Sequence, residues 1–251
     1  MRIIVVCVTL LALVLLGCDN GTGPLKSNVQ VSFASRGQAG ATFAERAPAA
    51  PTASDTLTDG TNTLIITSVE LVLREIELKQ QESANCDVEP KPAGCEDVEF
   101  GPVVVDLPLG PGARQRFSVE IPPGIYKAIE FEIHKVTSDD PATFRQQYPY
   151  LADQSIRVRG TYNGQAFTFL TDLDVEQTLL FNPFLIVTDT TTATNVTILV
   201  SVAAWFAGSD RKLLDPATGN KGGQNESLIK ENIKQSMEAF EDHDFDGKID
   251  G

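Results

Sequence analysis

The sequence predicts a mainly β protein, an antiparallel β-sandwich of the transthyretin or immunoglobulin kind with a C-terminal helix. Three observations lead to this prediction. Apolar and polar residues alternate over many segments of ordinary strand length. Turn signals such as Pro-Pro-Gly and Asn-Gly separate those segments. The 251 residues show neither a βαβ rhythm nor a glycine-rich phosphate loop, which disfavours a doubly wound α/β fold.

Residues 1–17 predict a lipoprotein signal peptide. Arg2 precedes an apolar run that is too short to span a membrane comfortably but suits a signal-peptide core. The run ends in Leu-Leu-Gly-Cys, which resembles the bacterial lipobox and makes Cys18 the expected lipidation site. Several acyl chains on this residue would anchor the protein stably in a membrane. The alternative is an ordinary secretory signal with a chance cysteine. Residues 18–27 are then the lipidated tether.

Two further cysteines, Cys86 and Cys95, bracket a short proline-rich stretch. In an exported protein this pattern predicts one disulfide that closes a small loop. A metal pair is the weaker alternative, because neither of the two histidines, His134 and His243, lies at ligand spacing from the cysteines. The expected location is the bacterial cell envelope, outside the cytoplasm and anchored by lipid.

The charge balance is strongly acidic. The chain has 34 Asp and Glu against 20 Lys and Arg, a formal net charge of −14. It has no stripe of basic residues that could follow a phosphate backbone, so nucleic-acid binding is disfavoured. An acidic surface suits solubility and divalent cations.

Residues 28–207 are predicted to form the sandwich, with about eight or nine strands. In the segment 63–80 the apolar phase slips by one residue after Leu73, because Ile76 and Leu78 are even-numbered. Such a slip indicates a β-bulge; a helix is the alternative. Asn163-Gly164 predicts a tight hairpin, since both central residues of that turn need positive φ.

The passage around Pro122-Pro123-Gly124 predicts a turn between two alternating runs. The second run has two predicted faces. The inner face holds Ile125, Ile129, Phe131 and Ile133, and the outer face holds Tyr126, Glu130, Glu132 and His134.

Residues 208–224 are predicted to form a linker, and residues 225–251 a helix followed by an acidic loop. Asn225 is a candidate N-cap for a helix over 226–241. The apolar positions at helical spacing are Ile229, Ile233, Met237 and Phe240. They predict packing against the sandwich, with binding to a partner protein as the alternative.

The last residues predict a calcium site. Counted from Asp242 as position one, the chain matches the EF-hand loop over ten positions, with Gly247 at position six for the sharp turn. The predicted ligands are Asp242, Asp244, Asp246, the carbonyl of Lys248, and Asp250. The bidentate glutamate of position twelve would fall beyond residue 251, so the expected dissociation constant is on the order of 10⁻⁴ to 10⁻³ M. The alternatives are an acidic tail that binds no ion and a half-site completed by a neighbouring chain.

Three passages resemble a family of bacterial lipoprotein domains of unknown function with a transthyretin-like or carbohydrate-binding-like sandwich. They are LIITSVELVLREIEL with Val69 and Leu71, then VVVDLPL with Val105-Asp106-Leu107, then EIPPGIYKAIEFEI with Pro123-Gly124, Tyr126, Ile129 and Phe131. The resemblance covers residues 28–135 and implies a sandwich that contains a Pro-x-Gly-x-Tyr hairpin. It implies no activity, and a fold analogy alone supports sugar binding only weakly.

The sequence therefore predicts a non-catalytic binding or structural module, held at the membrane by its lipid, with an envelope glycan or protein as partner. The alternative is an envelope-polymer (glycan) hydrolase or a carbohydrate-binding accessory protein. Glu130 and Glu132 are the carboxylate candidates for a hydrolase, but solvated side chains on a strand face are expected. His134 is expected at the surface, and Trp205 at the edge of the core rather than stacked on a sugar.

Overall fold

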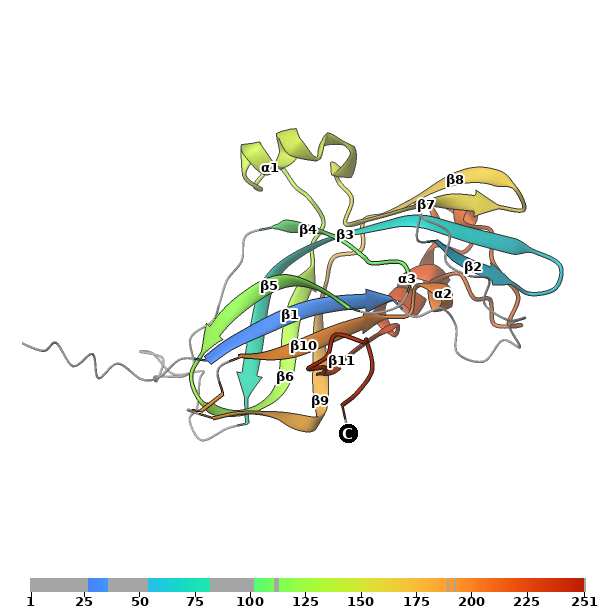
Figure 1. The fold of residues 1–251 in the computed structure, drawn as a ribbon. Coiled ribbons are helices and arrows are strands. Elements are labelled where there is room, and N and C mark those ends of the chain that lie inside the picture. Colours follow the sequence, from blue (N-terminus) through green and yellow to red (C-terminus); the bar gives the residue numbers. More distant parts are fainter. Residues whose placement is uncertain are drawn as a thin grey trace, which may run out of the picture.

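The computed structural model describes residues 27–35, 54–81, 102–110, 113–188, 190–191 and 193–250. Over these residues the chain is mainly β, a sandwich of two sheets with a few short helices, as predicted (Figure 1). Cys18, Cys86 and Cys95 lie outside the described residues. Among the residues described, none of the helices has the length and apolar character needed to cross a membrane.

One sheet has four strands in the order β11-β10-β1-β5, and the other has seven, in the order β8-β7-β3-β6-β9 with β2 and β4 also paired to β3. The strands β1 and β10 run parallel, and the other pairs are antiparallel, so one sheet is mixed where an antiparallel sandwich was predicted. The strands are β1 (Ser27–Ser35), β2 (Asp55–Thr58), β3 (Thr63–Gln80), β4 (Val103–Asp106), β5 (Arg114–Ile121), β6 (Gly124–Ile133), β7 (Ile156–Tyr162), β8 (Gln165–Thr171), β9 (Val175–Val187), β10 (Ala193–Val200) and β11 (Met237–Glu241). The helices are α1 (Ala142–Gln147), α2 (Val202–Trp205) and α3 (Glu226–Lys234), with 3₁₀ turns η1 (Pro149–Leu151) and η2 (Pro216–Gly219).

The apolar positions of both sheets form one hydrophobic core, which is what the alternating pattern requires. Phe33 on β1, Ile66 on β3 and Ile198 on β10 are almost completely buried in it. Burial of each such side chain contributes about 1.5–3 kcal/mol to stability before the entropy of ordering the chain is counted. The core therefore spans both layers and fixes which face of each strand turns inward.

The predicted bulge in the segment 63–80 is confirmed. β3 is one long strand, and its pairing with β6 shifts register between Arg74 and Glu77. Glu75 lies within the shift and adopts a φ of 55°, the left-handed region that L residues seldom occupy. The extra residue moves the apolar side chains from odd to even positions, so that Leu73 and Ile76 are both buried.

The predicted Asn-Gly hairpin is also confirmed. Asn163 and Gly164 have φ values of 50° and 79°, and Tyr162 pairs with Gln165 across the turn from β7 to β8. The side chain of Asn163 additionally accepts a hydrogen bond from the backbone N–H of Thr63, at 2.8 Å. The turn is thus joined to the start of β3.

The Pro-Pro-Gly turn joins the two sheets and does not close a hairpin. β5 pairs with β1, whereas β6 pairs with β3 and β9, so the hairpin implied by the family resemblance is wrong. The predicted faces of β6 are wrong at both ends. Ile125 is 44% exposed and Tyr126 is buried, because β6 contributes an extra residue where its pairing with β3 shifts register between Lys79 and Gln80. His134 is buried because it follows the last residue of β6 and leaves the alternation of the strand.

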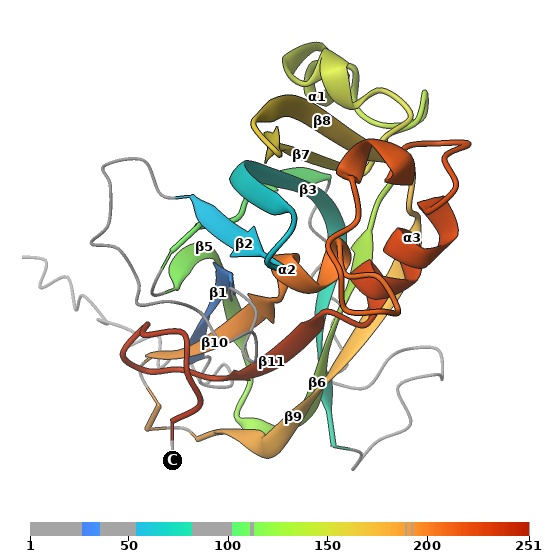
Figure 2. The ribbon, with the colours of Figure 1, turned by 90° about the vertical axis from the view of Figure 1, so that its right-hand side faces the viewer.

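The predicted C-terminal helix is present but ends earlier than the sequence indicates. α3 stops at Lys234, and its residues Ile229 and Ile233 pack into the sandwich core as predicted. The hydroxyl of Ser236 donates to the carbonyl of Ile233 at 2.6 Å and so satisfies one of the carbonyls at the helix end. The next residues form β11, which pairs with the open edge of β10 (Figure 2).

Candidate functional site

The C-terminal loop, residues 242–250, starts where β11 ends and lies on the four-stranded sheet. The backbone N–H of Asp242 donates to the carbonyl of Asn195 at 3.0 Å, and the N–H of Ala113 donates to the carbonyl of Phe245 at 2.8 Å. Phe245 and Gly247 have φ values of 59° and 77°, which gives the loop its tight bends. The element that leads into the loop is a strand, so the entering helix expected from the EF-hand comparison is wrong.

The Asp242 carboxylate is completely buried at the start of the loop. Its Oδ2 accepts hydrogen bonds from the hydroxyl of Thr197 at 2.7 Å and from the N–H of Gly247 at 3.1 Å. Its Oδ1 accepts one from the N–H of Asp246 at 3.1 Å. A buried carboxylate is costly unless donors and a positive charge compensate it, and these three donors supply only hydrogen bonds.

A chain of buried polar side chains behind Asp242 fixes its position. The hydroxyl of Ser32 on β1 donates to the amide oxygen of Asn195 at 2.6 Å. The amide nitrogen of Asn195 donates to the hydroxyl of Thr197 at 3.1 Å and to the backbone carbonyl of Asp242 at 2.7 Å. All four side chains are at most 2% exposed. The network joins β1, β10 and the loop, and it makes the Asp242 carboxylate a rigid group.

The loop brings three of its four aspartates together. One carboxylate oxygen from each of Asp242, Asp244 and Asp250 lies within 4.8 Å of the other two. Oxygens that bind one Ca²⁺ at about 2.4 Å are at most about 4.8 Å apart, so these three fit around one ion. Asp246 is not in the group: its carboxylate pairs with the ammonium of Lys248 and accepts the N–H of Lys248 at 2.8 Å.

The charges around the loop are only partly compensated. Hydrogen bonds from the backbone and ring of His243 lower the pKa of Asp250, so this carboxyl is ionised at neutral pH. The contact with Asp246 raises the pKa of Lys248, which keeps the ammonium protonated. The ammonium of Lys248 thus binds the aspartate that lies outside the acidic group. Three carboxylates remain together, and their donor atoms are all oxygens, the ligands that hard divalent cations prefer.

The sequence interpretation did not find the residues that hold the loop. Asn195 and Thr197 lie in the otherwise apolar run NVTILV, whose alternation by itself predicts a strand and no site. A usable signal was present, because Asn and Thr at alternate positions of an otherwise apolar strand indicate a face that is covered by something polar. Here the cover is Asp242 at the start of the loop.

The candidates for a hydrolase lie in other surroundings than predicted. The Glu130 and Glu132 side chains are only 21% and 16% exposed, and they form ion pairs with Lys79 and Arg74. Solvated carboxylates were expected at both positions; both lie on the outer face of β6, where they are half-buried and ion-paired. His134, expected at the surface, is 3% exposed.

Trp205 is completely buried, and its indole N–H donates to the hydroxyl of Ser236 at 2.7 Å. The amide of Asn232 on α3 donates to the carbonyl of Trp205 at 3.0 Å. The ring thus contacts the segment that follows α3, and the backbone of Trp205 contacts α3 itself. The side chain lies inside the core rather than at its edge, and no face of it is open to a sugar.

No family model, no curated protein and no solved structure matches this chain. The resemblance of residues 28–135 to the lipoprotein domain family therefore stays a prediction. The C-terminal loop and the buried network behind it are described from the residues and contacts of this chain alone.

Proposed function

We propose that this chain is a lipoprotein of the bacterial envelope, anchored outside the cytoplasm by lipid on Cys18, and that it works as a non-catalytic binding or structural module. The apolar run that ends at Cys18 supports the anchor, and the strongly acidic composition argues against nucleic-acid partners. The partner is an envelope glycan or protein. Calcium bound by the C-terminal loop stabilises the module.

One observation carries the calcium proposal: the completely buried Asp242 carboxylate lies beside the carboxylates of Asp244 and Asp250. Three negative charges this close repel one another, and one of them has no access to water. A divalent cation removes the repulsion and adds ligand bonds to oxygens that the loop already holds in place. Water and backbone carbonyls complete the six to eight oxygens that Ca²⁺ takes.

The ion would act on the fold through the same residues. Asp242 belongs both to the acidic group and to the network with Thr197 and Asn195 on β10. Calcium binding therefore favours the conformation in which β11 and the loop are docked on the four-stranded sheet. Any ion that binds only this folded form raises the free energy of unfolding by mass action.

A thermal-unfolding titration tests the proposal. The full-length chain carrying Cys18→Ser is purified in detergent, treated with a chelator and melted at increasing calcium concentrations. At a calcium concentration ten times the dissociation constant, binding at one site adds about 1.4 kcal/mol to the free energy of unfolding. This raises the melting temperature of a chain of this size by about 3–6 °C. The Asp244→Asn variant is expected to lose most of this rise, because it removes one carboxylate of the group.

The matched control is Asp139→Asn, which removes an exposed aspartate far from the loop in sequence. It is expected to keep the calcium response of the unchanged chain. A melting temperature that does not depend on calcium would refute the proposal. An equal rise in the Asp244→Asn variant would also refute it, since the ion would then bind elsewhere.

A further inference from the structure

A second group of possible metal ligands lies in the seven-stranded sheet, at the adjoining ends of β6 and β9. Glu132 is on β6, His134 follows directly after β6, and Asp174 directly precedes β9. The register pairs Glu132 with Glu176 and Ile133 with Val175, so the next position on β6 faces Asp174. One ligand atom from each of the three residues lies within 4.8 Å of the other two.

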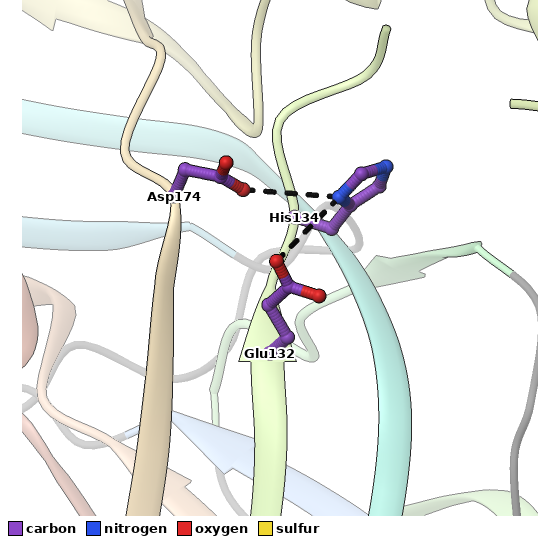
Figure 3. A group of neighbouring side chains, drawn as sticks. All are labelled: Glu132, His134 and Asp174. Atoms are coloured by element: carbon purple, nitrogen blue, oxygen red, sulfur yellow. Dashed lines mark ion pairs between the residues drawn. The ribbon is translucent and has the colours of Figure 1, made fainter. Parts of the chain in front are cut away.

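The imidazole of His134 has one nitrogen without a hydrogen bond. His134 is 3% exposed, and its Nδ1 finds no donor or acceptor at hydrogen-bonding distance among the described residues. Nδ1 points between two carboxylates (Figure 3), 3.8 Å from Oε1 of Glu132 and 3.7 Å from Oδ1 of Asp174. Both distances exceed the 2.7–3.2 Å or so of a hydrogen bond. A buried polar atom of this kind is unusual, and an ion bound to it would explain it.

The other side of the ring is fixed by Asp140. Nε2 of His134 lies 2.8 Å and 2.9 Å from the two carboxylate oxygens of Asp140, which is 7% exposed. The Asp140 carboxylate also accepts the N–H of Thr137 at 2.7 Å. A proton on Nε2 is required for this contact, so the neutral ring turns the lone pair of Nδ1 toward Glu132 and Asp174. Histidines that bind metals commonly donate their second N–H to a carboxylate in this way.

The two carboxylate ligands are held as well. The guanidinium of Arg74 binds Glu132 through both oxygens, and its second contact, with Oε1, is 3.3 Å long. Oδ1 of Asp174 accepts the backbone N–H of Lys135 at 2.9 Å. Positions fixed in advance lower the entropic cost of binding an ion.

The charges of the group leave room for a dication. Among the described residues, the carboxylates of Glu132, Asp140 and Asp174 have one ion pair with a guanidinium, that of Arg74 with Glu132, while the guanidinium of Arg145 binds the backbone carbonyl of Asp140. With a neutral imidazole, −3 and +1 give a net charge of −2. Buried charges of one sign are costly unless something balances them, and a divalent cation at Nδ1 would bring the sum to zero.

We infer that Glu132, His134 and Asp174 bind a divalent first-row transition metal ion of the zinc class, with Asp140 as the residue that orients the histidine. Two ligands of a tetrahedral ion at about 2.1 Å lie about 3.4 Å apart, within a few tenths of an ångström of the observed 3.7 Å and 3.8 Å. Imidazole nitrogen with carboxylate oxygen suits zinc, iron, cobalt or nickel, whereas Ca²⁺ takes oxygen alone.

The site opens to water on one side. The Asp174 side chain is 45% exposed, against 4% for His134 and 16% for Glu132. An ion can enter past Asp174, and water can fill the coordination positions that the three protein ligands leave free. The inference does not depend on the calcium proposal, because the two groups share no residue and lie on different sheets.

The test measures zinc bound per chain. The full-length protein in detergent is exposed to Zn²⁺, desalted and analysed for metal, beside the variants Asp174→Asn and Glu132→Gln. Asp174→Asn is the main variant, because the side chain of Asp174 is partly exposed and its replacement does not disturb the core. The melting curve of this variant without metal checks that it folds. The controls are Asp139→Asn for a nearby exposed aspartate and Asp244→Asn for the C-terminal loop.

We expect one zinc ion per chain in the unchanged protein and in both controls, and at least about tenfold weaker binding in Asp174→Asn and Glu132→Gln. Asp140→Asn should weaken binding by about 10–100-fold while keeping all three ligands. Equal zinc in Asp174→Asn and the unchanged chain would overturn the inference, and so would the absence of bound zinc from the unchanged chain.

A second readout follows the ring itself. The chain has two histidines, so in a His243→Gln protein the remaining imidazole signals in a ¹⁵N spectrum belong to His134. Zinc should shift the Nδ1 resonance and leave Nε2 protonated. A ring whose two nitrogens are both protonated, and whose spectrum zinc does not change, would identify an imidazolium held by three carboxylates and would overturn the inference.

Discussion

Thr197→Val tests whether the buried network holds the C-terminal loop. Valine has nearly the shape of threonine and suits a strand, so the change removes one hydroxyl and little else. That hydroxyl donates to the buried carboxylate of Asp242 at 2.7 Å and accepts from Asn195 at 3.1 Å. A hydrogen bond to a charged group contributes about 1.5–3 kcal/mol. Asn195 still donates to the backbone of Asp242 after the substitution. Most of the lost stability therefore comes from the missing hydrogen bond to the Asp242 carboxylate.

We therefore expect Thr197→Val to lower the free energy of unfolding by about 2 kcal/mol, which corresponds to about 4–8 °C in melting temperature for a chain of this size. Thermal unfolding followed by circular dichroism in the presence of a chelator measures it without the contribution of metal. Thr168→Val on the exposed face of β8 is the matched control and should stay within about 0.5 kcal/mol of the unchanged chain. If both variants have the melting temperature of the unchanged protein, the hydroxyl of Thr197 does not stabilise Asp242 and the network argument fails.

Two further changes test other parts of the fold. Glu75→Gly should stabilise the protein by about 0.5–1 kcal/mol in chemical denaturation, because relief of the left-handed φ of 55° exceeds the added chain entropy of glycine; a loss of stability would show that the bulge needs the glutamate side chain. Hydrogen bonds from Lys230, and then Lys221, lower the pKa of Asp172, so this carboxylate stabilises the protein above its usual pKa, and the contribution is lost as the pH falls through the lowered value. Asp172→Asn should thus cost about 1 kcal/mol at neutral pH and little in strong acid; an equal cost at both pH values would contradict the ion-pair explanation.

The sequence predicted those features of the sandwich in which a short local pattern requires a particular backbone conformation. Asn163-Gly164 requires positive φ, and the phase slip after Leu73 requires an extra residue, so both features could be predicted without knowledge of the partner strand. The end of α3 could not be predicted in this way. Met237 and Phe240 continue the helical spacing, but the open edge of β10 competes for the same residues, and that edge exists only in the folded sheet.

The two candidate metal sites likewise divide into features that the local sequence predicts and features that depend on strand pairing. The aspartate spacing identified the C-terminal loop, yet it could not show that Asp246 pairs with Lys248 and stays out of the acidic group. The group around His134 was not predicted as a metal site, because Glu132 and Asp174 are far apart in sequence and meet only through the register of β6 with β9. Contacts of this kind are set by strand pairing, which a single sequence does not reveal.

The parallel pair of β1 and β10 also determines the order in which the protein can fold. Asn28 pairs with Ala193, so the first described strand has no neighbour on that side until most of the chain has been synthesised. The last strand of the same sheet ends at Glu241, which postpones completion of the sheet further. Closing loops of this length is slow because their entropy must be lost before the contacts form. The first strand must therefore stay unpaired along this edge until β10 has been synthesised.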